Sequence, residues 1–191
     1  TYGIHPKPGS RAPRLSLGAH VMAHEDGITF SVDNTEFHLN LLGEFNVLNA
    51  LAAIGVARSQ GISLQVCSNA LKKMEVVPGR METVVQKPFR VVVDYAFTPA
   101  ALEKVYQTLK PTPSSDGVPR VHHGAKLICM LGAAGGGRDK WKRPVLGKLA
   151  GTYCDTVIVT NEDPYEENPM DIIEQVAKGA ESISSSSLKT L

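Results

Sequence analysis

The order of apolar and polar residues along the chain predicts short strands first and then strands that alternate with helices. Apolar and polar residues alternate in two runs near the N-terminus, which is typical of a β-ribbon. A further apolar run, 15–22, follows a Pro- and Gly-bearing segment. The predicted strands are 27–32, 37–41, 82–86, 89–94, 127–131 and 156–160. The predicted helices are 45–59, 64–74 with Ser63 as its N-cap, 99–109, 144–153 and 169–179.

The alternation in the second half of the chain indicates right-handed βαβ units and a mainly parallel sheet, so the predicted fold class is α/β. A Val-Pro-Gly turn at 77–79 separates a helix from a strand. We place a domain boundary there, between 1–77 and 78–191. The polar, Pro-rich stretch 110–124 is interpreted as a solvated surface insertion.

Three loops are expected to meet at one edge of this sheet. They follow Asp94, Leu131 and Thr160, each of which ends a predicted strand. Because ligands of parallel sheets gather at the carboxyl ends of the strands, these loops predict a single site.

The loop after Leu131 is rich in glycine and in basic residues. Its glycines let the backbone approach a charged ligand, and the helix that follows offers unpaired N–H groups and a partial positive charge. The same loop carries four cations, Arg138, Lys140, Lys142 and Arg143. This combination predicts an anion-binding turn, and a solvated basic loop is the alternative.

Composition narrows the class of protein. The chain has 191 residues, 42% of them hydrophobic, which is enough for one domain and part of another. A formal net charge of +1 favours neither nucleic acid nor an acidic membrane surface as a partner. The cysteines, Cys67, Cys129 and Cys154, lack metal-ligand spacing, and the last two are expected to be buried thiols. Without a membrane-length apolar run or a signal-peptide profile, we expect a cytoplasmic protein.

Five motifs together resemble a known family. They are GEFNVLNALAA at 43–53, VPGRME at 77–82, VVVDYAFTPAALE at 91–103, GGRDKWKRP at 136–144 and TNEDPY at 160–165. In this order and spacing the chain resembles the C-terminal part of a Mur ligase, of the UDP-N-acetylmuramoyl-tripeptide synthetase type. The resemblance runs from about Gly27 to Gly179.

The resemblance implies a fold and a reaction. Residues 78–191 would form a truncated, Rossmann-like C-terminal Mur ligase domain, and 1–77 the C-terminal part of the ATP-binding central domain. The reaction would be ATP-dependent amide formation, in which a carboxylate of a UDP-MurNAc-dipeptide becomes an acyl phosphate and an amino acid amine displaces the phosphate. Positioning and charge neutralisation by Mg²⁺ and cations dominate such catalysis, so no catalytic nucleophile is assigned.

Four residues match the family's ATP-binding positions. Asn49 would approach adenine, because a carboxamide both donates and accepts hydrogen bonds, and a helix-surface role is the alternative. Arg80 would lie near the nucleotide, or else form an interdomain salt bridge. Asp94 would accept the ribose hydroxyls, or else form a turn. Lys142 would orient the loop or face the ATP phosphates, as would Arg143, whereas Asn46 is interpreted as a cap of its helix.

Four residues match the positions that hold the incoming amino acid. Arg138 would grip the α-carboxylate with its guanidinium fork; a phosphate contact or a structural role are the alternatives. Relatives that add meso-diaminopimelate typically have Asp-Asn-Pro-Arg where this chain has Glu162, Asp163, Pro164 and Tyr165. Because Tyr165 carries no positive charge and the two carboxylates add negative charge, lysine or another diamino acid is favoured over meso-diaminopimelate.

Some family features are absent from the sequence. It contains no Gly-Thr-x-Gly-Lys-[Ser/Thr] phosphate loop, no Gly-Lys-Gly-His-Glu motif, and Phe97 stands where the family usually has His. We therefore expect an enzyme fragment that is inactive alone, is a monomer and has most Mg²⁺ ligands upstream. A folylpolyglutamate or cyanophycin synthetase type of ligase, and a non-catalytic nucleotide-binding module, are the alternatives.

Overall fold

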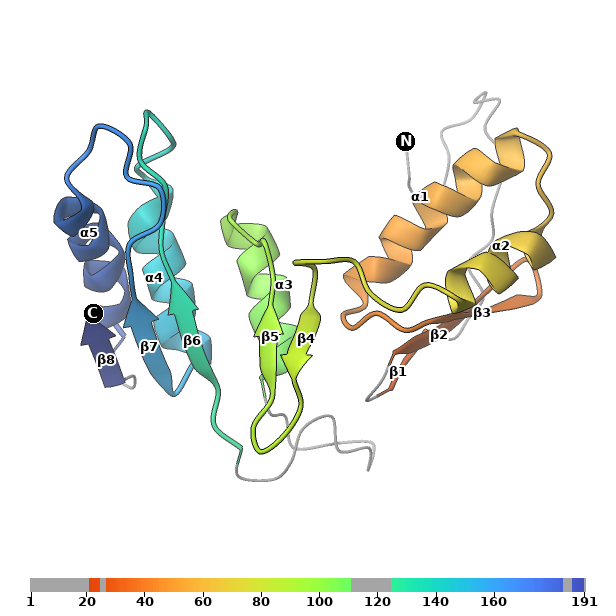
Figure 1. Ribbon diagram of the computed structural model, residues 1–191, viewed down its shortest axis with the longest axis horizontal. Helices are drawn as coiled ribbons and strands as arrows, with labels where there is room; N and C mark the ends of the chain where they lie inside the picture. Colours follow the sequence, from red (N-terminus) through yellow and green to blue (C-terminus); the bar gives the residue numbers. More distant parts are fainter. Residues whose placement is uncertain (1–20, 25–26, 111–124, 184–186, 191) are drawn as a thin grey trace. The chain divides into compact units, whose positions relative to one another are not determined.

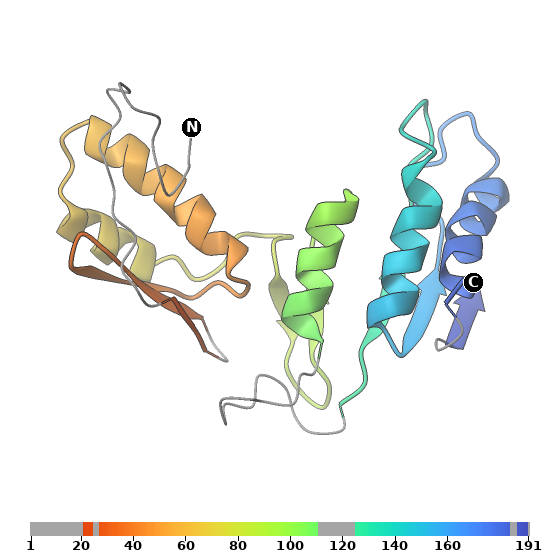
Figure 2. The same ribbon diagram turned by 180° about the vertical axis from the view of Figure 1, so that it is seen from behind.

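The computed structural model describes residues 21–24, 27–110, 125–183 and 187–190 (Figures 1 and 2). The chain forms two units, Thr1–Tyr95 and Ala96–Leu191, each with its own hydrophobic core. The predicted apolar run at 15–20 and the predicted insertion at 111–124 lie outside the described residues. None of the helices described here has both the length and the apolar character that crossing a membrane requires.

The first unit begins with an antiparallel ribbon of order β1-β2-β3 (Met22–Ala23, Ile28–Val32, Thr35–Leu39). Asp33 and Asn34 connect β2 to β3 with φ of 45° and 64°, the left-handed pair of a two-residue hairpin turn. Alternate residues of the ribbon are buried, among them Phe30 and Phe37, whose rings stack at 5.2 Å. The alternation in the sequence therefore predicts this ribbon correctly.

Two helices cover the buried face of the ribbon. Helix α1 (Phe45–Ser59) coincides with the predicted segment, and α2 (Leu64–Lys72) ends slightly before the predicted position. The Ser63 hydroxyl caps α2 by accepting a hydrogen bond from the Val66 N–H at 3.3 Å, as its residue type indicates. Helices and ribbon share one core (Ile28, Phe30, Val32, Phe37, Leu39, Leu41, Val47, Ala50, Ile54, Cys67).

The interpretation of Asn46 as a helix cap is wrong. Helix α1 begins at Phe45 with Glu44 at its N-cap position, and no side chain caps it. Asn46 is buried inside the first turn, where its amide donates to the Leu42 carbonyl at 2.7 Å. Its side-chain oxygen accepts from the Asn49 amide at 2.9 Å instead of from the unpaired N–H groups at the start of the helix.

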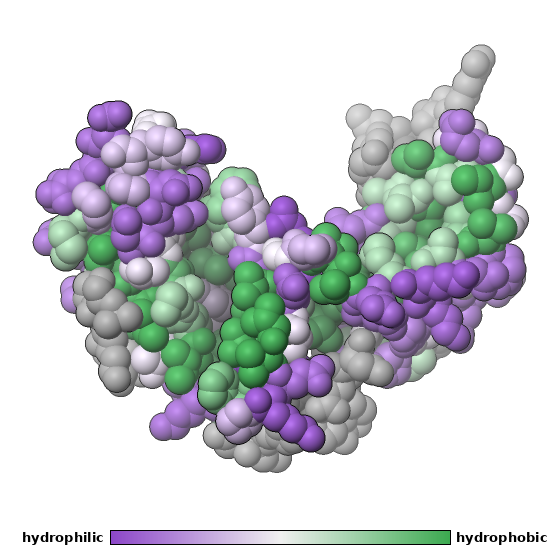
Figure 3. Space-filling model, viewed as in Figure 1, coloured by the Kyte–Doolittle hydropathy of each residue, from purple (hydrophilic) through white to green (hydrophobic). Residues whose placement is uncertain are grey.

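Strands β4 (Glu82–Val85) and β5 (Val91–Val93) complete the first unit as an antiparallel pair. Their connection is too short for the crossover that parallel strands need, so this pair departs from the mainly parallel pattern predicted for the second half. Apolar side chains are exposed on this pair (Figure 3), including Val84 and Val93, and Phe89 in the connection between the strands is exposed as well.

The second unit contains a parallel sheet of order β6-β7-β8 (Ile128–Leu131, Thr156–Val159, Ser187–Thr190). Helices α4 (Lys142–Tyr153) and α5 (Pro169–Glu181) pack on one face of it, with α3 (Pro99–Leu109) beside α4 (Figures 1 and 2). Buried Val157 and Val159 of β7 contact this helical layer. The α/β prediction is confirmed, and α3 coincides with its predicted range, whereas β8 was not predicted.

Helices α4 and α5 approach each other closely through glycine. A Cβ atom on Gly147 would lie 1.8 Å from the Val176 carbonyl oxygen, and one on Gly179 would lie 2.0 Å from the Pro144 carbonyl oxygen. Both distances are far below van der Waals contact. The absence of a side chain at these positions therefore allows the two backbones to meet.

Candidate functional site

The loops that follow β6 and β7 lie side by side at the carboxyl end of the sheet. The Thr160 N–H donates to the Leu131 carbonyl at 3.0 Å, and the Gly135 N–H donates to the Asp163 carbonyl at 2.8 Å. The structure therefore brings together the glycine-rich turn and the Glu162–Tyr165 loop. Phe97, in the loop that leads into α3, joins them because the Lys142 ammonium lies 5.4 Å from the centre of its ring.

Two glycines make this close contact possible. A Cβ atom on Gly135 would lie 2.1 Å from the Pro164 carbonyl oxygen, and one on Gly136 would lie 2.8 Å from the Tyr165 ring. Gly136 has a φ of +65°, and Tyr165 itself has a φ of 52°, a left-handed conformation that is uncommon for a bulky residue. Backbone strain of this kind clusters at ligand sites, which fits the role predicted for this loop.

Arg143 is the most deeply buried charged residue among those described, and it ties three segments together. Its guanidinium forks onto both carboxylate oxygens of Glu167 at 3.0 Å each. It also donates to the Gln175 side chain at 3.1 Å and to the Ala134 carbonyl at 3.2 Å. Its Nε–H has no hydrogen-bond partner among the residues of the described ranges.

Glu167 receives a second cation as well. The Lys140 ammonium lies 2.8 Å from the same carboxylate, and the Lys140 side chain stays 62% exposed. The hydrogen bonds from Arg143, followed by that from Lys140, lower the pKa of Glu167 to about 2. The carboxylate is therefore charged at all physiological pH values.

The four residues predicted to hold the incoming amino acid are exposed. Arg138 lies in the turn with its N–H donating to the Gly135 carbonyl at 3.3 Å, and its guanidinium has no ion-pair or hydrogen-bond partner within the part of the chain described. Glu162, Asp163 and Tyr165 are exposed on the neighbouring loop. The exposed guanidinium and the two exposed carboxylates therefore lie on adjoining loops.

Three of the predicted nucleotide-binding residues lie in the first unit: Arg80 and Asp94 at one turn, and Asn49 on α1. Arg80 lies over the Tyr95 ring at 5.0 Å, and one carboxylate oxygen of Asp94 accepts from the Met81 N–H at 2.8 Å. Asn49 is on α1, where its amide donates to the Asn46 side chain at 2.9 Å. Asp94 thus holds the turn at Met81, whose φ is 50°, as its turn-forming alternative requires.

Sequence reasoning did not find Glu167 and Gln175. Glu167 lies in an acidic stretch beside Glu166, and Gln175 lies within an amphipathic helix, so neither has a distinguishing local signal. Both accept hydrogen bonds from Arg143, because a buried guanidinium requires partners. These contacts join residues far apart in the sequence, so the sequence alone does not reveal them.

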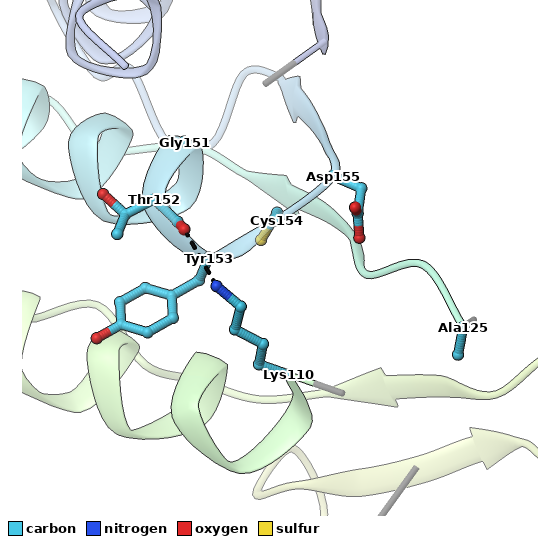
Figure 4. A pocket seen from close by; sticks show the side chains of 7 residues that line it. All are labelled: Lys110, Ala125, Gly151, Thr152, Tyr153, Cys154 and Asp155. Carbon is cyan, nitrogen blue, oxygen red and sulfur yellow. Dashed lines mark hydrogen bonds between the residues drawn. The ribbon is translucent and has the colours of Figure 1, made fainter. Parts of the chain in front are cut away.

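A hollow of about 260 Å³ lies at the other end of β7, away from these loops (Figure 4). The Lys110 ammonium reaches across it to the Thr152 carbonyl at 3.5 Å. The buried Cys154 is among the residues that line the hollow, and its hydrogen bond with Cys129, together with burial, raises the pKa of its thiol. Cys129 and Cys154 are buried, as predicted.

Metal-ligating side chains are not clustered in the described part of the chain. Within the ranges that the structure describes, no three side chains of His, Cys, Asp or Glu are grouped to hold a metal ion.

Comparisons with known proteins show what the chain is similar to. A family model described as Mur ligase, glutamate ligase domain, matches residues 79–190. The UDP-N-acetylmuramyl-tripeptide synthetase of Roseiflexus sp. (strain RS-1) is 39% identical over 188 residues, covering 96% of this chain and 34% of that protein. The UDP-N-acetylmuramoyl-L-alanyl-D-glutamate–2,6-diaminopimelate ligase of Halalkalibacterium halodurans is 34% identical, covering 94% and 35%. The chain thus spans about a third of the length of these relatives.

Solved structures share the fold at lower identity. The UDP-N-acetylmuramate-alanine ligase MurC from Thermotoga maritima has a TM-score of 0.70 and 22% identity, covering 95% of this chain and 38% of that one. A Mycobacterium tuberculosis folylpolyglutamate synthase has a TM-score of 0.67 and 20% identity, covering 93% and 38%. The α/β fold class, with a Rossmann-like C-terminal domain, is confirmed.

Proposed function

The chain belongs to the Mur ligase family, and we propose on that premise that it is the C-terminal part of an ATP-dependent amide ligase. The proposed reaction adds an amino acid to a UDP-MurNAc-dipeptide through an acyl phosphate, in peptidoglycan precursor synthesis. The proposed domains are 1–77 and 78–191; the family model begins at Gly79, whereas chain contacts divide the units after Tyr95.

The observation that carries this proposal is the contact between the glycine-rich turn and the Glu162–Tyr165 loop. The hydrogen bond from Gly135 to Asp163 at 2.8 Å puts Arg138 and Tyr165 on adjoining loops. A guanidinium binds an α-carboxylate in bidentate fashion, and this holds the amino acid while its amine attacks. Arg138 is proposed to bind the α-carboxylate, because its guanidinium has no competing partner within the described ranges.

The side-chain end of the amino acid is proposed to face Glu162 and Asp163. Both carboxylates are exposed, and the phenol of Tyr165 offers no positive charge to a second carboxylate. A side-chain ammonium is attracted to this surface, whereas a distal carboxylate is repelled. We therefore propose L-lysine or another diamino acid as substrate in preference to meso-diaminopimelate.

The nucleotide is proposed to contact Asn49, Arg80, Asp94 and Lys142. Arg80 and Asp94 flank the same turn, which supports a shared role at one ligand. ATP would supply the phosphoryl group, and most ligands of Mg²⁺ would lie upstream of this chain. Alone, the chain is expected to ligate nothing and to bind magnesium-ATP weakly, because the phosphates supply much of the affinity in such sites.

An NMR titration of the ¹⁵N-labelled 191-residue chain with L-lysine tests the amino-acid site. We expect weak binding that shifts amide signals of the glycine-rich turn and the 162–165 loop. Arg138→Gln should abolish these shifts, because it removes the charged fork and keeps a polar side chain. Lys148→Gln, which removes a cation from the exposed face of α4, is the matched control and should bind as the wild type does.

Two outcomes contradict the proposal. In one, Arg138→Gln binds L-lysine as tightly as the wild type. In the other, calorimetry finds submicromolar binding of magnesium-ATP to the isolated chain, which would refute its role as one part of a larger nucleotide site.

A further inference from the structure

The buried ion pair between Arg143 and Glu167 lies directly behind the contact that forms the proposed site. Arg143 donates to the carbonyl of Ala134, and the next residue, Gly135, donates to Asp163. On the other loop, the Glu167 N–H donates to the Pro164 carbonyl at 3.0 Å. The pair therefore joins the two loops. Arg143 reaches the glycine-rich turn one residue before Gly135, and Glu167 ends the turn that begins at Pro164.

Burial of this pair is not explained by stability. Side-chain exposure is 1% for Arg143 and 20% for Glu167, so forming the pair removes most of the hydration of the guanidinium. Charges taken out of water gain little net stability from pairing, whereas their geometry is demanding. A fork of two parallel hydrogen bonds defines both the distance and the angle between the segments that carry it.

The position of Tyr165 depends on the same turn. Its backbone is in the left-handed region at φ 52°, and its ring lies against Gly136. The turn from Pro164 to Glu167 is closed by a hydrogen bond and anchored at its end by Arg143. The anchor therefore holds a strained residue over the glycine-rich turn.

We propose that Arg143 and Glu167 are positioning residues that lock the glycine-rich turn to the 162–165 loop and so set the shape of the amino-acid pocket. Neither side chain needs to touch the substrate. The existence of an amino-acid pocket rests on the proposed function. The lock between the two loops does not, because it is present in the chain without ligand.

The test is amide hydrogen exchange of the whole chain, read residue by residue by NMR without ligand. Glu167→Gln keeps the shape of the side chain and removes its charge. We expect it to speed exchange of the Gly135 N–H roughly tenfold to a hundredfold, because a charge-assisted anchor behind that hydrogen bond is lost. Arg143→Met should have the same effect. Glu166→Gln, the neighbouring exposed carboxylate, is the matched control and should change this rate less than about twofold.

The exchange rates of the Val157 and Val159 amides in β7 distinguish a local lock between the loops from a general contribution to stability. These N–H groups should keep their rates within about twofold in Glu167→Gln, because local opening spares the sheet. A parallel rise at Gly135 and in β7 would show a merely structural role and overturn the inference, as would an unchanged rate at Gly135. If Arg143→Met does not fold, Glu167→Gln alone decides.

A second titration keeps this inference distinct from the proposed function. Glu167→Gln should weaken L-lysine binding several-fold, whereas Glu166→Gln should not. Should the wild type bind no amino acid, the proposed function fails while the exchange of Gly135 still decides whether the lock exists. Should the wild type bind and Glu167→Gln bind equally well, the lock does not shape the pocket and the inference is refuted.

Discussion

Replacing Gly147 by Ala should separate helices α4 and α5 and destabilise the second unit. The added Cβ would lie 1.8 Å from the Val176 carbonyl oxygen and 3.0 Å from the Ala180 nitrogen. Both atoms belong to backbone of α5, which cannot rotate away as a flexible side chain can. The helices must therefore move apart along their whole crossing.

The magnitude follows from two opposing terms. Overpacking of this kind costs about 1–3 kcal/mol, and the upper end applies because the obstacle is backbone. Alanine in a helix regains about 1 kcal/mol over glycine. We expect a net loss of about 2 kcal/mol, which lowers Tm by roughly 8–16 °C for a unit of this size.

Urea denaturation followed by the fluorescence of Trp141 measures the loss, because the single tryptophan lies in the second unit. Gly137→Ala is the control: it places a side chain at a positive φ, 76°, which Gly147 does not have, and the new Cβ meets no atom within 4 Å. It should cost about 1 kcal/mol, the conformational term alone. A Gly147→Ala variant as stable as the wild type would refute the close approach of the helices.

The double variant Gly147→Ala, Gly179→Ala sharpens the argument. The Gly179 Cβ would meet the Pro144 carbonyl oxygen at 2.0 Å, in the same crossing. Once one substitution has separated the helices, the second meets less obstruction, so the two losses should sum to more than the loss in the double variant. Strict additivity would mean that the two glycines act independently.

Three further outcomes are expected. The folded-state pKa of Glu167, about 2, lies below its ordinary value of 4.5. The charged carboxylate should therefore contribute its full stability above about pH 4.5 and lose it as pH falls towards 2. In acid unfolding, the difference in stability between wild type and Glu167→Gln should vanish near pH 2. In a complete ligase that contains this chain, Tyr165→Arg with Asp163→Asn should raise kcat/KM for meso-diaminopimelate relative to L-lysine by about tenfold to a hundredfold, because one charged hydrogen bond is gained; a wild type that already prefers meso-diaminopimelate would refute this reading. Cys154, whose pKa is raised, should react with a thiol-specific disulfide reagent at pH 8 much more slowly in the folded chain than in urea, and equal rates would show that it is not buried.

The elements that the sequence predicts well are those with local signals at their ends. Helix α3 starts at Pro99, after a Thr98 hydroxyl that accepts from the Ala101 N–H, and both residues are visible in the sequence. Helix α5 begins in the same manner, with Asn168 before Pro169. Such caps act within a few residues, so no knowledge of the fold is needed.

The elements that the sequence misses depend on distant partners. Strand β8 (Ser187–Thr190) lies in a serine-rich stretch without apolar alternation, and it becomes a strand by pairing with β7. The antiparallel pairing of β4 and β5 could have been foreseen, because only five residues, 86–90, connect them. For β8 the sequence holds no comparable signal.

The basic turn illustrates how tertiary structure divides residues that look alike in sequence. Its four cations suggest a strong site for a multiply charged anion. In the structure Lys140 and Arg143 both pair with Glu167, and Lys142 lies against the Phe97 ring. Of the four, only the Arg138 guanidinium lacks a hydrogen-bonding, ionic or ring partner within the described part of the chain. One unpaired fork matches one carboxylate better than it matches a chain of phosphates, and this favours the amino acid over the nucleotide as the ligand of Arg138.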